Sequence, residues 1–199
     1  MEPGSVVAGA SPFASLRIPA FRWWFLAQIL SGSWSMAQGV GTAWLILKLT
    51  GSGVDLGLLT TALFGPVLLA GAWAGALLDH VDHRRALIAT QVASGGLALA
   101  LFALTATGAV RVWMVFALSV GTGFVFAVDQ PARQLYVVDL VGRERVQSAV
   151  GLFEVMINAS RVLGPATGGV MIATLGVSAC FLVNAASFVP PLLVLLWFR

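Results

Sequence analysis

Six long apolar runs, separated by short polar segments, set the pattern of this chain of 199 residues. Two of these runs, 56–78 and 86–107, contain no Asp, Glu, Lys or Arg and flank a short charged turn. About 20 apolar residues are enough for a helix to cross a bilayer core about 30 Å thick. The pattern therefore predicts six membrane-spanning helices, at about 23–47, 56–78, 86–107, 112–128, 148–175 and 179–198.

These spans predict an all-α membrane protein with a cytoplasmic N-terminal tail at 1–20 and a six-helix transmembrane domain at 21–199. Connections on one side are brief, at 50–55, 108–111 and 176–178. On the other side lie the charged turn and a longer segment, 132–147, for which we expect a separate interfacial helix. An even number of spans places both termini on the same side.

The distribution of basic residues predicts the orientation. Lys48 and Arg111 fall on the side opposite the termini, and Arg161 lies within the fifth span. The other basic residues fall on the side of the termini: Arg17, Arg22, Arg84, Arg85, Arg133, Arg143, Arg145 and Arg199. Because basic residues concentrate in cytoplasmic loops, we expect both termini in the cytoplasm and the chain in a bacterial-type inner membrane.

Composition changes this picture little. Hydrophobic residues make up 59% of the chain and charged residues 10%, against about 25% charged in soluble domains, so the lipid bilayer must be a partner of the surface. There is no basic run that would bind nucleic acid, and the single cysteine, Cys180, excludes an internal disulfide. No catalytic or metal-ligating cluster appears, so we expect neither an enzyme nor a cofactor.

Polar residues inside two spans form stripes at helical spacing. In the first span, a stripe within roughly an 80° arc contains Gln28, Ser31, Ser35, Gln38 and Thr42. In the fifth, an arc of roughly 100° contains Gly151, Glu154, Asn158, Arg161, Pro165 and Gly168. Lipid does not tolerate such stripes, so we expect both on one open side of the bundle as a small-molecule pathway. For Ser and Thr the alternative is a bond to their own helix.

Three ionisable residues are candidates for coupling and for substrate binding. Arg161 keeps its proton and suits an anionic substrate or a fixed counter-ion, with Asn158 as a possible bridge to Glu154. Glu154 can titrate if buried and is the first candidate for proton coupling. Asp129 is the second; with Arg133 it spans Pro131 at the end of the fourth span, where a solvated helix-end pair is the alternative.

The charged turn carries a family resemblance. Its residues Gly75, Asp79, Arg84 and Arg85 resemble the signature loop of major facilitator superfamily transporters, with His80 and Asp82 as departures. The resemblance implies that Asp79 and Arg84 act as a conformational latch, with the Asp facing a helix N-terminus in a second half of the transporter. The implied fold is the N-terminal half of such a transporter, working by alternating access.

A second motif lies in the fifth span, where Gly164, Pro165, Gly168 and Gly169 resemble the Gly-Pro-x-x-Gly-Gly motif of proton-driven antiporters in the superfamily. Pro bends a helix and small residues admit a close partner, which suits a gate; ordinary packing is the alternative. Gly65-Pro66 in the second span echoes this motif. Such an echo is typical of two inverted three-helix repeats.

Further segments resemble the enterobactin-exporter-like group, which exports drugs or siderophores: 21–28, 43–45, 49–52 and 131–134. Those transporters are about twice as long, so the resemblance implies a proton-coupled efflux function carried here by the N-terminal half. The partner is then a missing C-terminal half or a second copy. The alternatives are a truncated fragment that transports nothing and a homodimeric half-transporter.

Overall fold

The computed structural model describes residues 13–198, in which every regular element is a helix. Two short 3-10 helices, Ala14–Arg17 and Arg143–Arg145, precede the first and fifth long helices. The long helices are α1 Pro19–Thr50, α2 Gly53–Leu78, α3 His83–Ala106, α4 Val112–Val141, α5 Val146–Leu175, α6 Val177–Ser187 and α7 Val189–Trp197. Most of the expected N-terminal tail lies outside the described residues.

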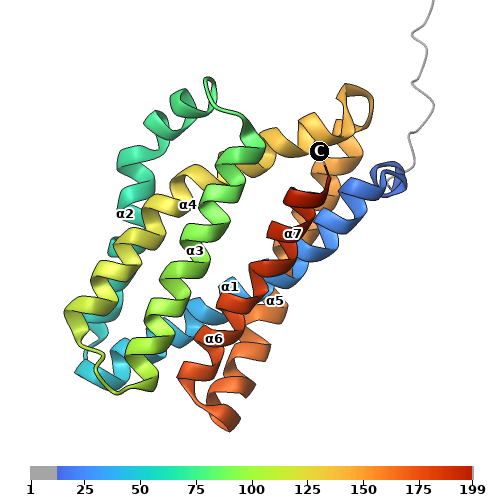
Figure 1. Ribbon diagram of the computed structural model, residues 1–199. Coiled ribbons are helices and arrows are strands. Elements are labelled where there is room, and N and C mark those ends of the chain that lie inside the picture. Colours follow the sequence, from blue (N-terminus) through green and yellow to red (C-terminus); the bar gives the residue numbers. More distant parts are fainter. Residues whose placement is uncertain (1–12, 199) are drawn as a thin grey trace, which may run out of the picture.

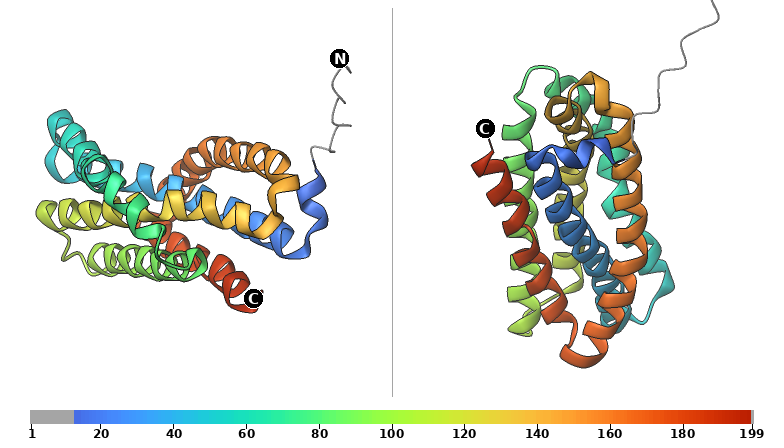
Figure 2. Two further views of the ribbon diagram at one scale, coloured as in Figure 1. Left: turned by 90° about the horizontal axis from the view of Figure 1, so that it is seen from above. Right: turned by 90° about the vertical axis from the view of Figure 1, so that its right-hand side faces the viewer.

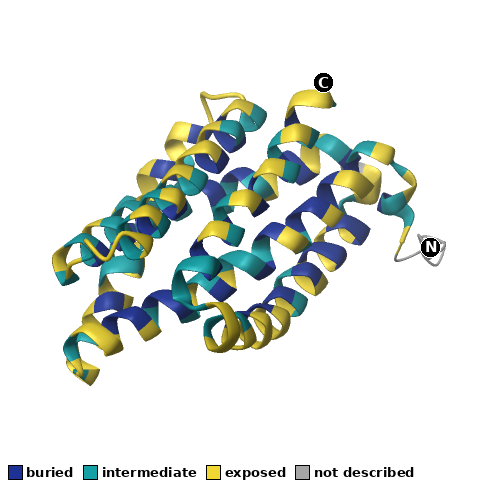
Figure 3. Cartoon of the chain, turned by 60° about the horizontal axis from the view of Figure 1, so that its bottom comes forward, coloured by how far each residue is buried: buried dark blue, intermediate teal, exposed yellow. Residues whose placement is uncertain are grey.

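The helices form three layers, which are clearest in the view from above (Figure 2). α1 and α4 make the middle layer, α2 and α5 lie on one side of them, and α3 and α6–α7 lie on the other (Figures 1 and 2). The main contacts join α1 to α5, α2 to α4, and α3 to both α4 and α6. Buried positions line the faces between helices, and the outer faces are exposed (Figure 3).

The expected tight hairpins are present, and local chemistry explains them. α1 ends at Gly51, whose φ of 65° is a left-handed conformation that glycine adopts without strain. The Ser52 hydroxyl accepts a hydrogen bond from the amide of Asp55 at 3.3 Å and starts α2. Asp82 starts α3 in the same way, since its carboxylate accepts from the amide of Arg85 at 2.8 Å.

The end of the fourth helix differs from the expectation. α4 runs unbroken to Val141, so the predicted end at residue 128 and the separate interfacial helix at 132–147 are wrong. Proline removes only one backbone donor, and α4 continues through Pro131. The charges of Asp129 and Arg133 do not end the helix either, because they pair with each other.

The last predicted span is divided into two helices. α6 ends at Ser187 and α7 begins at Val189. Pro190 and Pro191 lack the amide hydrogens that would extend α6, but they fit the first turn of α7, where those hydrogens have no partner within the helix. Within the described residues, four segments are long and apolar enough to cross a membrane: α2, α3, α4 and α6–α7 taken together. α1 and α5, which carry the two polar stripes, do not meet that apolar criterion.

Aromatic packing fixes one end of α1 against two neighbours. Trp24 is fully buried, with its ring centroid 6.0 Å from that of Tyr136 on α4 and 6.4 Å from that of Phe153 on α5. The rings of Phe21 and Phe25 stack beside it, with centroids 6.0 Å apart. This cluster holds α1, α4 and α5 in a fixed register next to the polar residues described below.

Glycine allows α5 to approach α1 closely. A Cβ at Gly164 would clash with the Cβ of Met36 and would lie 2.6 Å from the carbonyl oxygen of Ser33. A Cβ at Gly168 would lie 3.0 Å from the Cα of Ala37, whereas one at Gly169 would meet no atom within 4 Å. The two helices therefore pack backbone to backbone at Gly164 and Gly168, as small residues permit in membranes.

We predict that Gly164→Ala destabilises the α1–α5 contact by about 1–3 kcal/mol, the usual cost of overpacking. Gly169→Ala is the matched control on the same helix, and it should leave stability unchanged or raise it by about 0.5–1 kcal/mol through helix propensity. Unfolding by denaturing detergent, followed by circular dichroism, measures both. Equal stability of the two variants would contradict the close approach.

Candidate functional site

A buried carboxylate–guanidinium pair joins three helices. Asp129 is only 5% exposed, and one of its carboxylate oxygens accepts hydrogen bonds from the Thr90 hydroxyl at 2.7 Å and the Gln91 amide at 3.1 Å. Its other oxygen accepts from Nε of Arg133, one turn further along α4. The pair is therefore embedded between α3 and α4, and the expectation of a solvated helix-end pair is wrong.

Arg133 also reaches α1. Its Nη1 donates to the side-chain oxygen of Gln28, which is fully buried. Burying two opposite charges is costly unless their remaining hydrogen-bonding atoms are satisfied. Here Gln28 of α1 accepts from Arg133, and Thr90 and Gln91 of α3 donate to Asp129, so both charged groups have neutral hydrogen-bond partners. We call these five residues, Gln28, Thr90, Gln91, Asp129 and Arg133, the Asp129 centre.

Unused hydrogen-bonding capacity remains beside the Asp129 centre. Among the described side chains, three polar atoms of its immediate surroundings are buried without a partner in the protein: Nε2 of Gln28, Oγ of Ser31 and Oε1 of Gln91. The indole nitrogen of Trp24 shares this state. Buried polar atoms in proteins are nearly always paired, with ordered water if not with protein, so these groups form a site suited to water.

The Asp129 centre lies well away from the ends of its helices. Thr90 is about 10 Å from the first residue of α3, and Gln28 is about 14 Å from the first residue of α1, at 1.5 Å per residue. Asp129 lies about 18 Å before the end of α4 by the same rise. All three positions face one another well inside the bundle, where ionisable residues are rare and usually functional.

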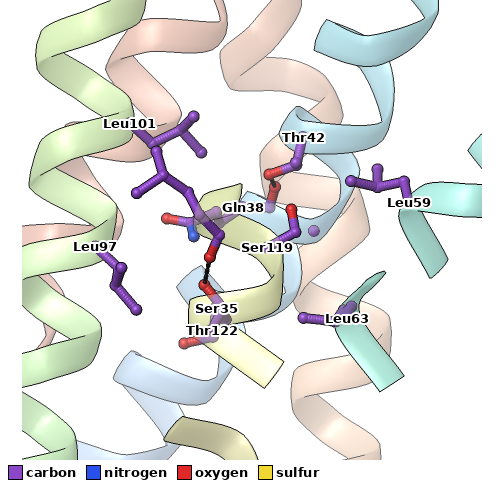
Figure 4. A pocket seen from close by; sticks show the side chains of 11 residues that line it. Ser35, Gln38, Thr42, Leu59, Leu63, Leu97, Leu101, Ser119 and Thr122 are labelled. Atoms are coloured by element: carbon purple, nitrogen blue, oxygen red, sulfur yellow. Dashed lines mark hydrogen bonds between the residues drawn. The ribbon is translucent and has the colours of Figure 1, made fainter. Parts of the chain in front are cut away.

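The rest of the α1 stripe lines a pocket. Ser35, Gln38 and Thr42 face a cavity of about 110 Å³ between α1, α2, α3 and α4, opposite Ser119 and Thr122 of α4 (Figure 4). Leucines from α2, α3 and α4 complete its wall. The amide of Asn184 on α6 donates to Gln38 at 2.8 Å, and the Ser35 hydroxyl donates to the Asn184 oxygen at 3.4 Å.

Thr42 bonds to its own helix, which is the alternative to a pathway role for Ser and Thr. Its hydroxyl donates to the carbonyl oxygen of Gln38, one turn earlier on the same helix, at 2.9 Å. Ser33, outside the stripe, does the same toward Ile29 at 2.8 Å. Ser31 makes no such bond. Ser31 therefore stands apart from these two hydroxyls, because its oxygen is buried and free.

The α5 stripe lies in a different environment. Glu154, Asn158, Arg161 and Pro165 are all exposed, whereas Gly168 packs on α1. The Asn158 amide donates to the backbone carbonyl of Glu154 at 2.9 Å. Because the α1 stripe is buried against α4 and α6 while the α5 stripe is exposed, the expectation of one shared open side is wrong.

The charged turn is partly tied to the end of this same chain. Arg84 donates to the carbonyl oxygens of Leu195 at 2.6 Å and Leu196 at 3.3 Å, so it caps the last turn of α7. Asp79 and Arg85 are exposed, and a Cβ at Gly75 would meet no atom within 4 Å. The turn therefore presents Asp79 outward while Arg84 holds α7.

A polar contact between α3 and α4 was not predicted from the sequence. Nδ1 of His83 lies 2.7 Å from a carboxylate oxygen of Asp139. Thr90 and Gln91 were missed as well, although they are adjacent polar residues deep in an otherwise apolar run. That interruption was the available signal. For His83 and Asp139 there was none, since both lie in segments expected to be solvated.

Comparison with known proteins identifies relatives of this arrangement. A family model described as "Transmembrane secretion effector" matches residues 10–199. The staphyloferrin A transporter of Staphylococcus aureus is 30% identical over 150 residues, which cover 75% of this chain and 38% of that protein. The multidrug efflux pump Tap of Mycolicibacterium fortuitum is 29% identical over 171 residues, covering 81% and 41%.

The Tap pump of Mycobacterium tuberculosis is 28% identical over 180 residues, covering 87% of this chain and 42% of that pump. The chain thus spans about two fifths of the length of these curated relatives. Their names describe membrane transporters, not enzymes.

We predict that Arg133→Met lowers the stability of the folded chain by about 3–5 kcal/mol, since it leaves the Asp129 carboxylate buried without its counter-charge. The double variant Asp129→Asn/Arg133→Met should recover much of that loss, because no uncompensated charge remains. Arg145→Met, at an exposed position, is the control and should change stability by less than about 0.5 kcal/mol. Equal effects of Arg133→Met and Arg145→Met in detergent unfolding would refute a buried pair.

Proposed function

Because the chain belongs to the transmembrane secretion effector family of major facilitator superfamily transporters, we propose that it forms the N-terminal half of an efflux transporter. In this proposal all six segments span the membrane, as two inverted three-helix repeats, α1–α3 and α4–α7. Both termini lie in the cytoplasm of a cell with a bacterial-type inner membrane. The exported molecules are small, as in the enterobactin-exporter-like group.

The exposed stripe of α5 is the observation that carries this proposal. Glu154, Asn158 and Arg161 are exposed on α5, next to exposed apolar residues of the same helix such as Val155 and Val162. A charged residue at the centre of a bilayer costs about 2.5–3.5 kcal/mol on insertion scales, so lipid is a poor cover for two of them. Protein and water on the far side of α5 would remove that cost.

α2 presents a second open face on the same layer of the bundle (Figure 2). Leu68 is 87% exposed, and a Cβ at Gly71 or Gly75 would meet no atom within 4 Å. α2 and α5 thus form one outer layer on the same side of α1 and α4 (Figure 2). A second six-helix half placed against this layer would cover both exposed faces and would enclose a pathway between the halves.

Alternating access then follows from rocking of the two halves around that pathway. Gly164 and Gly168 approach α1 closely next to Pro165, which supports a bend at which α5 pivots. Gly169 lies on the exposed side of α5 and leaves room there for the other half. The exposed Asp79 is placed to meet a helix N-terminus of the second half by a charge–dipole contact. Arg84 supports this latch indirectly, because its bonds to the end of α7 hold the turn that carries Asp79. Arg85 adds positive charge on the cytoplasmic side.

The substrate class follows from the charges of the pathway. Arg161 and Asn158 offer a fixed positive charge and an amide, which favours an anionic or strongly hydrogen-bonding molecule. The polar residues of the α1 stripe face the interior of the same half, toward α4 and α6: Gln28, Ser31, Ser35, Gln38 and Thr42. We assign proton coupling, and hence antiport, to one or both of the carboxylates Glu154 and Asp129.

We expect that the chain alone transports nothing. The proposed pathway has only one wall in a single copy, so proteoliposomes containing the chain should show no pH-gradient-driven flux of a fluorescent drug. Joining the chain by a flexible linker to the C-terminal half of the M. tuberculosis Tap pump should restore flux. Strong flux by the unlinked chain, together with cross-linking of Asn158→Cys between two copies, would instead support the homodimeric half-transporter.

Within the linked transporter, Glu154→Gln should abolish proton-driven efflux while leaving folding and drug binding intact, because the amide cannot take up a proton. Glu144→Gln, a change of the same kind at an exposed position next to the turn into α5, should keep efflux at the unmodified rate. Efflux assays across an imposed pH gradient measure both. Full efflux by the Glu154→Gln variant would leave Asp129 as the coupling carboxylate.

A further inference from the structure

We propose that protons reach Asp129 through the interior of the bundle, along the buried polar stripe of α1. The route begins at the pocket lined by Ser35, Gln38 and Thr42 and ends at the Asp129 centre. It is separate from the exposed stripe of α5, which we assign to the substrate and to Glu154, the other carboxylate of the proposed coupling. This inference rests on the proposed proton coupling and specifies the path that the proton takes.

The spacing of the stripe is the first support. Its members recur every three or four residues, so neighbours along α1 are about 4.5–6 Å apart in rise. That separation is too long for one hydrogen bond of about 3 Å but fits two bonds with a water between them. The stripe is therefore suited to a chain of single waters bridging successive polar side chains.

The unpaired buried atoms are the second support. Ser31 is 1% exposed, and its hydroxyl lies on the stripe between Gln28 and Ser35 without a partner in the protein. Nε2 of Gln28 is a free donor and Oε1 of Gln91 is a free acceptor on the two sides of the Asp129 centre. A hydroxyl, a donor and an acceptor are what buried waters need in order to remain bound.

The cavity is the third support. The pocket of about 110 Å³ exceeds the space that one water occupies and carries hydroxyls of Ser35, Thr42, Ser119 and Thr122 on its wall. It lies between the same helices α1, α3 and α4 that form the Asp129 centre. Gln38 lies about 15 Å from Gln28 along α1, so the route needs only Ser31 and Ser35 as intermediate positions.

The proton balance at the end of the route is simple. A hydronium ion gives its proton to a carboxylate oxygen of Asp129, a new O–H bond forms, and water remains. Among the described residues, Arg133 is the charged group that bonds to Asp129. The other groups around the pair are neutral: Gln28 on α1, and Thr90 and Gln91 on α3. The Asp129–Arg133 pair thus changes from net neutral to one positive charge.

The protonated form has partners in place. Gln91 already donates to Asp129 through its amide nitrogen, and its Oε1 is unpaired, so a rotation of that amide would offer the new O–H group an acceptor. Arg133 keeps its bond to Gln28. One buried positive charge is costly without compensation.

The experiment uses the 199-residue chain, attached by its N-terminus to an infrared crystal in a supported bilayer. The α1–α2 connection then faces the solution, which is acidified rapidly. We expect the carboxyl stretch of protonated Asp129 to appear after acidification and to be missing in Asp129→Asn. Ser31→Ala should slow its appearance about tenfold, the effect of losing one hydrogen bond of about 1.4 kcal/mol along the route.

Two matched variants separate the route from general damage. Ser33→Ala removes a hydroxyl of the same helix that is bonded to Ile29 and, on α5, to Ser160, away from the stripe, and should not change the rate. Ser31→Thr keeps a hydroxyl and should retain most of the rate. Equal rates for Ser31→Ala and Ser33→Ala would overturn the route, and absence of an Asp129-dependent band would overturn the proton site. No transport is measured, so failure of the proposed efflux function would appear in the flux assays alone.

Discussion

The arrangement of this protein depends on the buried ion pair between Asp129 and Arg133. Two opposite charges in an apolar bundle are costly unless further hydrogen bonds satisfy their remaining donors and acceptors. α3 offers Thr90 and Gln91, and α1 offers Gln28. The pair thereby fixes the rotation of three helices about their axes, because turning any of them would leave a charge or an amide without its partner.

Much of the fold could be predicted from the apolar pattern, since the periodicity of apolar residues indicates helices and the short connections indicate hairpins. The end of α4 could not be predicted in this way. Asp129, Pro131 and Arg133 together look like the end of a membrane span, because each is unfavourable in an isolated apolar helix. Their mutual pairing, which depends on α1 and α3, reverses that expectation and carries the helix on to Val141.

The candidate site was only partly predictable for a related reason. Helical spacing groups Gln28 to Thr42 on one stripe of α1 and Glu154 to Arg161 on one stripe of α5, but it does not say which neighbour covers each stripe. The α1–α5 contact decides this, through Gly164 and Gly168 against Ser33 and Ala37. With those faces in contact, the α1 stripe turns toward α4 and α6, and the α5 stripe turns outward.

The two stripes therefore have different physical properties despite similar sequence patterns. On α5 the charges are exposed at fixed positions, which suits recognition of a molecule that arrives from outside the bundle. On α1 the groups are uncharged and buried or partly buried, and the stripe ends at the Asp129–Arg133 pair, which suits a small carrier such as a proton. The Gly-mediated contact at Gly164 and Gly168 sets α5 directly against α1, so the two stripes lie on helices that touch while each faces a different environment. A rotation of either helix would therefore change the surroundings of both stripes at once.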